Sequence, residues 1–304
     1  MRAIAAFLIA LATPWPGAAE TPEQRAIGYL GDEVPRWFRE NQCMSCHNNG
    51  DGARALYAGV RLGYEVARDA LAGTTQWVAD PSRWDENRGS PAFSDKKLAR
   101  IQFAASLTEA YDSGIIRDRK ALMEAAKSLL PYQEKDGSWQ VDTEVEAGSP
   151  ATYGTALATY MARRTLERAG NCGDAVAKAD QWFRANKPRS VLDAAAMLLA
   201  LPGDEGVKQN SLEIILQAQT SDGGWGPQRY APAEPFDTAV VLLALKPIGY
   251  PDAVARGRAF LIRRQHPSGG WPETTRPPGA QSYAQHISTS GWAALALFAT
   301  DPKR

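Results

Sequence analysis

The stretch "RGRAFLIRRQHPSGGW", residues 256–271, joins an amphipathic segment to Gln265, and Trp271 follows after two glycines. Two other stretches end in the same way, "KSLLPYQEKDGSW" at 127–139 and "SLEIILQAQTSDGGW" at 211–225. The last two motif tryptophans lie 46 positions apart, and the first two lie 86 apart, close to twice that interval. This spacing predicts repeated supersecondary units, one of which lacks the motif. The motif pairs are Gln133 and Trp139, Gln219 and Trp225, and Gln265 and Trp271.

Each unit is predicted to be a helical hairpin. The segment "ALMEAAKSLLPYQ" at 121–133 has apolar residues at helical spacing among charged ones, which is typical of a helix with one solvated face. The segment "DTAVVLLAL" at 237–245 is apolar almost all round, which is typical of a buried helix. The same order without the full motif occurs at 35–64, 74–111 and 178–201, which brings the units to six.

Six such pairs can close a ring, with the amphipathic helices outside and the apolar helices inside. An open solenoid is the alternative, but it needs polar caps at its ends. The last unit ends in the apolar run "GWAALALFA" at 291–299, only a few residues before the C-terminus. We therefore predict an all-α fold, an α/α toroid of six helical hairpins, over residues 20–304.

The Gln-Trp stretches resemble the QW repeat of squalene-hopene and oxidosqualene cyclases, and the protein prenyltransferase β-subunits are related rings. The resemblance covers most of residues 20–304 and implies a toroid in which Gln and Trp brace the turn between outer and inner helices.

The chemistry of these families is not matched in the sequence. Triterpene cyclases use a D-x-D-D acid, which is absent, and Asp237 in "EPFDTAVV" stands where a lone Asp is typical of an N-cap. The prenyltransferases hold zinc with a cysteine close after an Asp, and no cysteine follows Cys172, to which we assign no role. The sequence therefore predicts that the shape is kept while cyclase and prenyltransferase activities are lost.

The first unit has "QCMSCH" at 42–47 where a Gln-Trp motif would stand. C-x-x-C-H is the spacing of c-type haem attachment, in which Cys43 and Cys46 form the thioethers and His47 is the proximal iron ligand. We therefore expect one haem c at the mouth of the toroid cavity. Two alternatives remain open, a structural zinc site with a distant fourth ligand and an oxidised Cys43–Cys46 pair.

Three further residues are candidates for the same site. In a closed ring the sixth unit touches the first, so His286 is a candidate distal ligand or acid–base group. The alternative for His286 is a histidine that is only hydrogen-bonded near a helix start. Arg54 and Arg61 follow the haem turn and are candidate contacts to the haem propionates, unless they are ordinary charges on a helix surface.

The N-terminus predicts a secretory signal peptide at 1–19, because Arg2 precedes a short apolar run and several small residues. That run is about half of the roughly 20 residues that a membrane span needs, and no later stretch is longer. The mature chain is therefore predicted to be periplasmic and to have no transmembrane segment. The 34 basic and 34 acidic residues balance without a basic run, which argues against nucleic acid as a partner.

These features lead to three hypotheses for function. The favoured one is a periplasmic c-type haem protein in electron transfer, with a redox partner. The second is a haem-dependent oxygenase or peroxidase-like enzyme acting on an apolar or isoprenoid molecule in the cavity. The third is a non-catalytic lipid-binding or scaffold protein. If the chain is an enzyme, the sequence predicts a haem-dependent oxidoreductase rather than a cyclase.

Overall fold

The computed structural model describes residues 20–87, 95–141, 147–276 and 283–303, and every regular element in these ranges is a helix. The predicted signal peptide at 1–19 lies outside the described residues. Short 3-10 helices occur at Pro81–Glu86, Leu130–Tyr132 and Lys246–Ile248. The α-helices are α1 (Pro22–Asn41), α2 (Asn48–Arg61), α3 (Arg68–Val78), α4 (Lys96–Asp112), α5 (Arg119–Leu129), α6 (Thr155–Ala169), α7 (Gly173–Ala185), α8 (Val191–Ala200), α9 (Glu205–Ala218), α10 (Pro235–Leu245), α11 (Pro251–Arg264) and α12 (Tyr283–Ala299).

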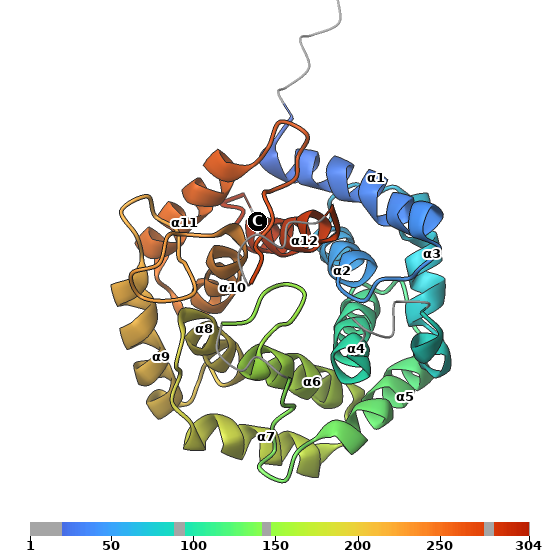
Figure 1. Cartoon of the computed structure of the whole chain (residues 1–304), viewed down its shortest axis with the longest axis horizontal. Helices are drawn as coiled ribbons and strands as arrows, with labels where there is room; N and C mark the ends of the chain where they lie inside the picture. Colours follow the sequence, from blue (N-terminus) through green and yellow to red (C-terminus); the bar gives the residue numbers. More distant parts are fainter. Residues whose placement is uncertain (1–19, 88–94, 142–146, 277–282, 304) are drawn as a thin grey trace, which may run out of the picture.

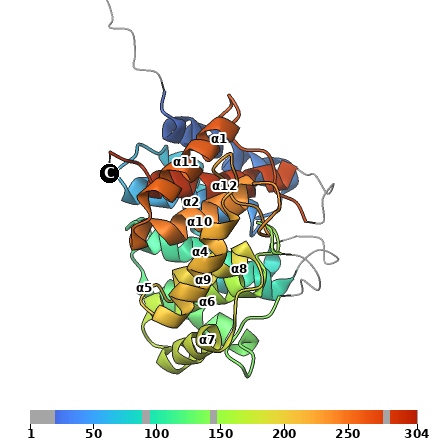
Figure 2. The same cartoon turned by 90° about the vertical axis from the view of Figure 1, so that its left-hand side faces the viewer.

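The helices form two concentric rings (Figure 1). The odd-numbered helices make the outer ring and the even-numbered helices the inner ring, so each outer helix is followed in the chain by its inner partner. The circle closes where α1 and α2 pack against α12. Figure 2 shows the same ring from the side, with α9 and α11 of the outer ring toward the viewer. The predicted α/α toroid of six helical hairpins is confirmed.

The two rings differ as their sequences require. The inner helix α10 buries nearly every residue, because its sequence PFDTAVVLLAL offers apolar side chains in every direction. The outer helix α11 buries only one face, and Arg256, Arg263 and Arg264 are exposed on the other. The inner ring is therefore the hydrophobic core of the protein, and polar groups within it stand out.

Each of the three Gln-Trp turns connects the outer and inner helix of one hairpin, and its glutamine hydrogen-bonds to the next hairpin. In the last turn, Trp271 Nε1 donates to the Leu261 carbonyl at 2.8 Å, and Gln265 Nε2 donates to the carbonyls of Gly269 at 3.0 Å and Pro22 at 2.9 Å. Because Pro22 begins α1, this glutamine fastens the last hairpin to the first. The equivalent bonds in the other turns run from Trp139 to Leu129, from Trp225 to Ile215, from Gln133 to Gly137 and Ala175, and from Gln219 to Gly223 and Ala253.

A second contact closes the ring at its other rim. Arg258 of α11 forms an ion pair with Glu23 of α1 through Nη2. Its Nη1 donates to the Leu297 carbonyl at 2.7 Å and to the Thr300 hydroxyl at 3.2 Å. One guanidinium thus holds α1, α11 and the end of α12 together.

Replacing Gln265 with alanine should lower the free energy of unfolding by about 1–3 kcal/mol, because two backbone carbonyls lose their donor. Urea unfolding followed by circular dichroism would measure the change. Gln217→Ala is the control, since this exposed glutamine on α9 should change stability by less than about 0.5 kcal/mol. Equal midpoints for the two variants would show that the Gln265–Pro22 bond does not stabilise the closed ring.

Candidate functional site

Three buried side chains meet at the centre of the inner ring. Asp51 lies in the first turn of α2, Tyr153 precedes α6, and Trp292 belongs to α12. The Tyr153 hydroxyl donates to Asp51 Oδ1 at 2.7 Å, and Trp292 Nε1 donates to Asp51 Oδ2 at 3.1 Å. The two rings meet edge to face with their centroids 5.7 Å apart. Both oxygens of Asp51 are therefore held as hydrogen-bond acceptors, in a place that solvent does not reach.

Arg54 places a buried cation in the same cluster. Its guanidinium carbon lies 3.8 Å from the centroid of the Trp292 ring, a cation–π contact that burial strengthens. Its Nη2 lies 3.5 Å from Asp51 Oδ1, and its Nη1 lies 3.4 Å from Met161 Sδ on α6. Arg54 of α2 thus reaches both α6 and α12, and its positive charge balances the negative charge of Asp51.

A second buried acid lies at the start of α10. Asp237 is fully buried, and its Oδ2 forms an ion pair with Arg276, which also binds Glu234 at 3.0 Å. Burial raises the pKa of Asp237 to about 7, although the Arg276 guanidinium opposes the rise. This carboxyl group is therefore partly protonated at neutral pH. Its buried Oδ1 has no hydrogen-bond partner among the described residues.

The two acids share one aromatic wall. Phe236, the neighbour of Asp237, meets the Trp292 ring edge to face with the centroids 5.4 Å apart. Trp292 in turn donates to Asp51, so the indole contacts both Asp51 and the residue next to Asp237. We call this set the acid–aromatic cluster, and it consists of Asp51, Arg54, Tyr153, Phe236, Asp237, Arg276 and Trp292.

A strap, residues 147–154, covers the cluster. Its backbone turns inward from the inner ring in front of α6 (Figure 1). Tyr153 has φ +60°, a conformation that is costly for an aromatic residue, yet its side chain is completely buried. Arg276 Nη1 donates to the Gly148 carbonyl, so the same arginine binds both the strap and Asp237. The strap therefore fills the space beside the acids with its own tyrosine.

The buried carboxyl of Asp51 should make stability depend on pH. Burial raises its pKa from 3.8 to about 6, so the folded state holds the proton more tightly than the unfolded state. This contribution is complete below pH ~4 and is lost as pH rises through ~6, a difference of about 3 kcal/mol. The free energy of unfolding should therefore fall between pH 4 and pH 7, and the Asp51→Asn variant should show a smaller fall. Parallel pH profiles for the two proteins would contradict this assignment.

The C-x-x-C-H segment forms the short connection between α1 and α2. Cys46 Sγ lies 3.8 Å from His47 Nδ1, and both residues are partly buried. Burial, aided by Asp51, raises the pKa of Cys46 to about 12, and burial lowers the pKa of His47 to about 4. Both side chains are therefore neutral at pH 7.

Backbone and side-chain hydrogen bonds brace this connection without a Gln-Trp pair. Ser45 N donates to Asn49 Oδ1 at 2.9 Å, and Asn49 Nδ2 donates to the Val34 carbonyl of α1 at 2.8 Å. Asn48 N donates to the Ser45 hydroxyl at 3.3 Å, which caps the start of α2. These bonds hold the connection to α1, although Asn48 Nδ2 is buried without a hydrogen-bond partner among the described residues.

The other sequence-predicted residues have protein partners. His286 Nε2 lies 2.5 Å from Glu273 Oε2, and its Nδ1 faces the Trp271 carbonyl at 3.2 Å. Arg61 Nη2 pairs with Glu109 Oε1 at 2.8 Å, and Arg54 belongs to the acid–aromatic cluster. Ring closure brings the sixth unit to the first as expected, since Ser288 donates to Asn48 at 3.0 Å.

The sequence analysis interpreted Asp237 as an N-cap, which is wrong because Glu234 is the N-cap of α10 and Asp237 lies inside the helix, and it did not single out Asp51. Glu234 and Asp237 occupy the first and last positions of the D-x-D-D spacing, and Phe236 occupies the third. This partial match to the acid motif could have identified Asp237 as a candidate from the sequence. Asp51 stands at the start of an inner helix among small residues, "NNGDGARAL", which was a weaker one. No sequence pattern indicated that Tyr153 contacts Asp51, because this contact depends on the path of the strap.

Comparison with known proteins places the chain near terpene cyclases. It is 30% identical over 173 residues to a drimenyl diphosphate synthase from Streptomyces showdoensis, covering 51% of this chain and 32% of that protein. A second drimenyl diphosphate synthase, from Streptantibioticus cattleyicolor, is 28% identical over 182 residues, covering 52% and 33%. The chain thus matches about a third of the length of these curated relatives. No protein-family model matches it.

Solved structures share the fold at low identity. The type II terpene cyclase MstE from Scytonema superposes with a TM-score of 0.60 at 12% identity, over 93% of this chain and 99% of that one. A wild-type glycosidase superposes with a TM-score of 0.57 at 12% identity, over 90% and 96%. The terpene cyclase-like toroid is therefore shown, and at these identities the superpositions carry no more than the fold.

These findings overturn the haem hypothesis. The sequence relatives are terpene cyclases, so the predictions of haem c, of haem-based electron transfer and of an enzyme other than a cyclase are wrong. Cys43, Cys46 and His47 belong to the braced connection before α2, and no group of three or more metal-ligating side chains occurs among the described residues. His286, Arg54 and Arg61 accordingly have no haem to contact. Within the same residues, no helix is long and apolar enough to cross a membrane.

Proposed function

We propose that this protein cyclises a linear isoprenoid by protonating it, with Asp237 as the proton donor. The observation that carries the proposal is the buried Asp237 carboxyl, whose Oδ1 has no partner and whose pKa is raised to about 7. A general acid is most effective when its pKa lies near the working pH. The two drimenyl diphosphate synthases among the relatives support this class of reaction.

The first step is proton transfer from Asp237 Oδ1 to one carbon of a terminal alkene, which leaves a carbocation on the other carbon. A second alkene of the same chain attacks the cation, so a carbon–carbon bond forms and the positive charge moves along the chain. The ring face of Phe236, and the face of Trp292 that Arg54 does not cover, stabilise the charge through their quadrupoles. Arg276 holds Asp237 in place by its contact to Oδ2.

The last step is loss of a proton from the cyclic cation, which restores an alkene. Asp51 is the base for this step, because it is ionised above its pKa of about 6 and is hydrogen-bonded to the indole of Trp292. The overall reaction is an isomerisation, because the proton that Asp237 gives is balanced by the proton that Asp51 takes, and no oxidant or reductant is consumed. A diphosphate group on the substrate remains attached throughout, since no step breaks its bond to carbon.

Substrate entry requires the strap to move. The side chains of Asp51, Tyr153, Phe236, Asp237 and Trp292 are each at most 1% exposed, so the closed structure offers no route to the acids. Withdrawal of Tyr153 would vacate the position beside Asp51. A closed cluster protects a carbocation from water, which would otherwise capture it.

Incubation with linear isoprenoid diphosphates such as farnesyl diphosphate, in deuterated buffer, tests the proposal. The expected product, after phosphatase treatment and mass spectrometry, is a cyclic alcohol that carries one deuterium from Asp237. Release of inorganic diphosphate would contradict the proposal, because it indicates ionisation of the diphosphate ester instead. Recovery of unchanged substrate from a panel of chain lengths would also contradict it.

A further inference from the structure

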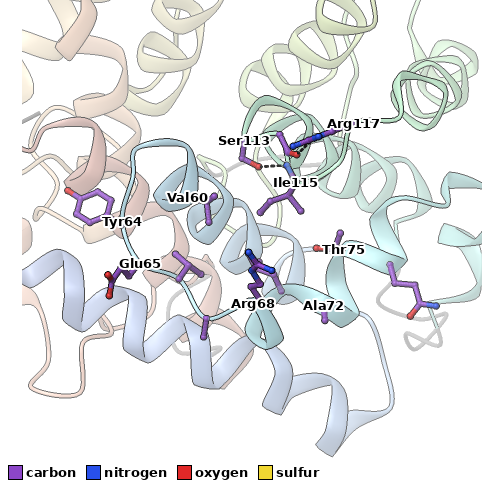
Figure 3. A pocket seen from close by; sticks show the side chains of 14 residues that line it. Val60, Tyr64, Glu65, Arg68, Ala72, Thr75, Ser113, Ile115 and Arg117 are labelled. Carbon is purple, nitrogen blue, oxygen red and sulfur yellow. Dashed lines mark hydrogen bonds between the residues drawn. The ribbon is translucent and has the colours of Figure 1, made fainter.

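A concave surface lies at the end of α2, outside the acid–aromatic cluster, and Figure 3 shows the side chains that line it. It encloses about 1220 Å³ between the end of α2, the first turns of α3 and the connection from α4 to α5. Val60 on this surface and Asp51 in the cluster lie nine residues apart on α2, or about 13 Å along its axis. We call it the rim pocket, and it is lined by Val60, Tyr64, Glu65, Val66, Ala67, Arg68, Leu71, Ala72, Thr75, Gln76, Ser113, Gly114, Ile115 and Arg117.

One part of the rim pocket is apolar. Val60, Ile115 and Ala72 project toward the same space (Figure 3), and Val66 and Leu71 also line it. Ile115 is 38% exposed, which is high for a large apolar side chain. Ligand pockets typically measure about 300–1,000 Å³ and are lined mainly by apolar side chains, so this space is large enough for a hydrocarbon chain.

The other part of the rim pocket is cationic. Arg68 and Arg117 line it, both are exposed, and neither forms an ion pair within the described ranges. Arg117 Nε donates only to the Gly114 carbonyl at 3.3 Å. Arg61, by contrast, lies on the same rim and is paired with Glu109 at 2.8 Å. The lining has one carboxylate, Glu65, so the two guanidiniums outnumber it.

We propose that the rim pocket binds a single-chain amphiphile with a phosphate-type head group, such as an isoprenoid phosphate. The hydrocarbon chain lies along Val60, Leu71 and Ile115, and the head group binds Arg68 and Arg117. Guanidinium groups suit phosphate oxygens because they present several donors in one plane. The apolar wall and the uncompensated charge together favour a ligand that has both parts. This site is separate from the acid–aromatic cluster and does not depend on turnover.

Isothermal titration calorimetry with farnesyl phosphate, below its micelle concentration, tests the site. The full chain should bind it saturably, and the double variant Arg68→Ala/Arg117→Ala should bind at least about tenfold more weakly. Arg189→Ala/Arg229→Ala is the control of equal charge change, since both arginines are exposed and lie outside the rim pocket, and its affinity should match the parent. Ile115→Glu, which puts a carboxylate on the apolar wall, should also weaken binding.

Several outcomes would overturn the proposal. Equal affinities of the two double variants would show that the arginines do not bind the head group. If farnesol bound as tightly as farnesyl phosphate, the pocket would not recognise the phosphate group. If inorganic phosphate bound as tightly, the pocket would not recognise the hydrocarbon chain. Arginine-dependent flotation with phosphatidic acid vesicles, without binding of farnesyl phosphate, would assign the surface to a membrane instead.

The Asp237→Asn variant separates this site from the proposed cyclisation. It should bind farnesyl phosphate as the parent does, even though its turnover is lost. Loss of binding in Asp237→Asn would place the ligand in the acid–aromatic cluster and overturn the rim pocket. Binding without turnover in the parent protein would support the rim pocket and contradict the cyclisation.

Discussion

Replacing Asp237 with asparagine should lower kcat for cyclisation by about 10²–10⁴-fold, the usual contribution of a general acid. The amide keeps the size of the side chain and its contact with Arg276 but has no acidic proton to give. Product formation from an isoprenoid diphosphate, measured under saturation, gives the effect. Glu234→Gln is the matched control, because this partly exposed partner of Arg276 should change kcat by about fivefold at most.

The pH profile of the parent enzyme should identify the same group. With a pKa of about 7, Asp237 is in its acid form below pH 6, so any fall of kcat below pH 6 should come from protonation of the base Asp51, whose pKa is about 6. Above pH 7 the acid form falls about tenfold per pH unit, and kcat should fall with it. A rate that rises with pH through this range would contradict Asp237 as the donor. Unchanged activity of Asp237→Asn would do the same.

Replacing Gly269 with alanine should cost about 2–5 kcal/mol of stability. Gly269 has φ +98°, which side chains rarely adopt, and a Cβ there would collide with the Arg25 carbonyl oxygen of α1. This glycine is also the residue whose carbonyl accepts from Gln265 in the closing turn. The substitution therefore separates α1 from the last hairpin.

Gly73→Ala is the control for this prediction. Gly73 lies in the middle of α3, is exposed, and has no atom within 4 Å of the position a Cβ would take. Alanine there should stabilise the protein by about 0.5–1 kcal/mol, since it reduces the freedom of the unfolded chain. Thermal and urea unfolding should show shifts of opposite sign. A stable Gly269→Ala protein would mean that the last turn does not pack against α1 as described.

The fold could be predicted because its information is local and repeated. The Gln-to-Trp spacing recurs three times, and apolar runs such as 237–245 allow only a buried helix. The units without the motif, at 35–64 and 178–201, have the same order of amphipathic and apolar segments. Closure followed because the final helix has no polar face that could end a solenoid.

The candidate site could not be predicted in the same way, because its residues are far apart in the sequence. Asp51 and Trp292 meet only after the ring closes, and Tyr153 reaches them through the strap. Burial then sets the pKa of Asp237, and no pattern in "EPFD" shows burial. The C-x-x-C-H motif is five residues long, so its match depends only on local order. The motif therefore predicted a haem where the chain forms a hydrogen-bonded connection between α1 and α2.

Closure of the ring also determines how the protein can come apart. In a linear array the terminal repeats have one neighbour each, so they fray first and unfolding spreads inward. Here Gln265 and Arg258 give the first and last hairpins two neighbours each, like every other hairpin. Any hairpin that opens must therefore break two interfaces, and a closed circle has no preferred starting point. Native-state hydrogen exchange should accordingly show all six inner helices protected to a similar degree, with no gradient from either end of the chain.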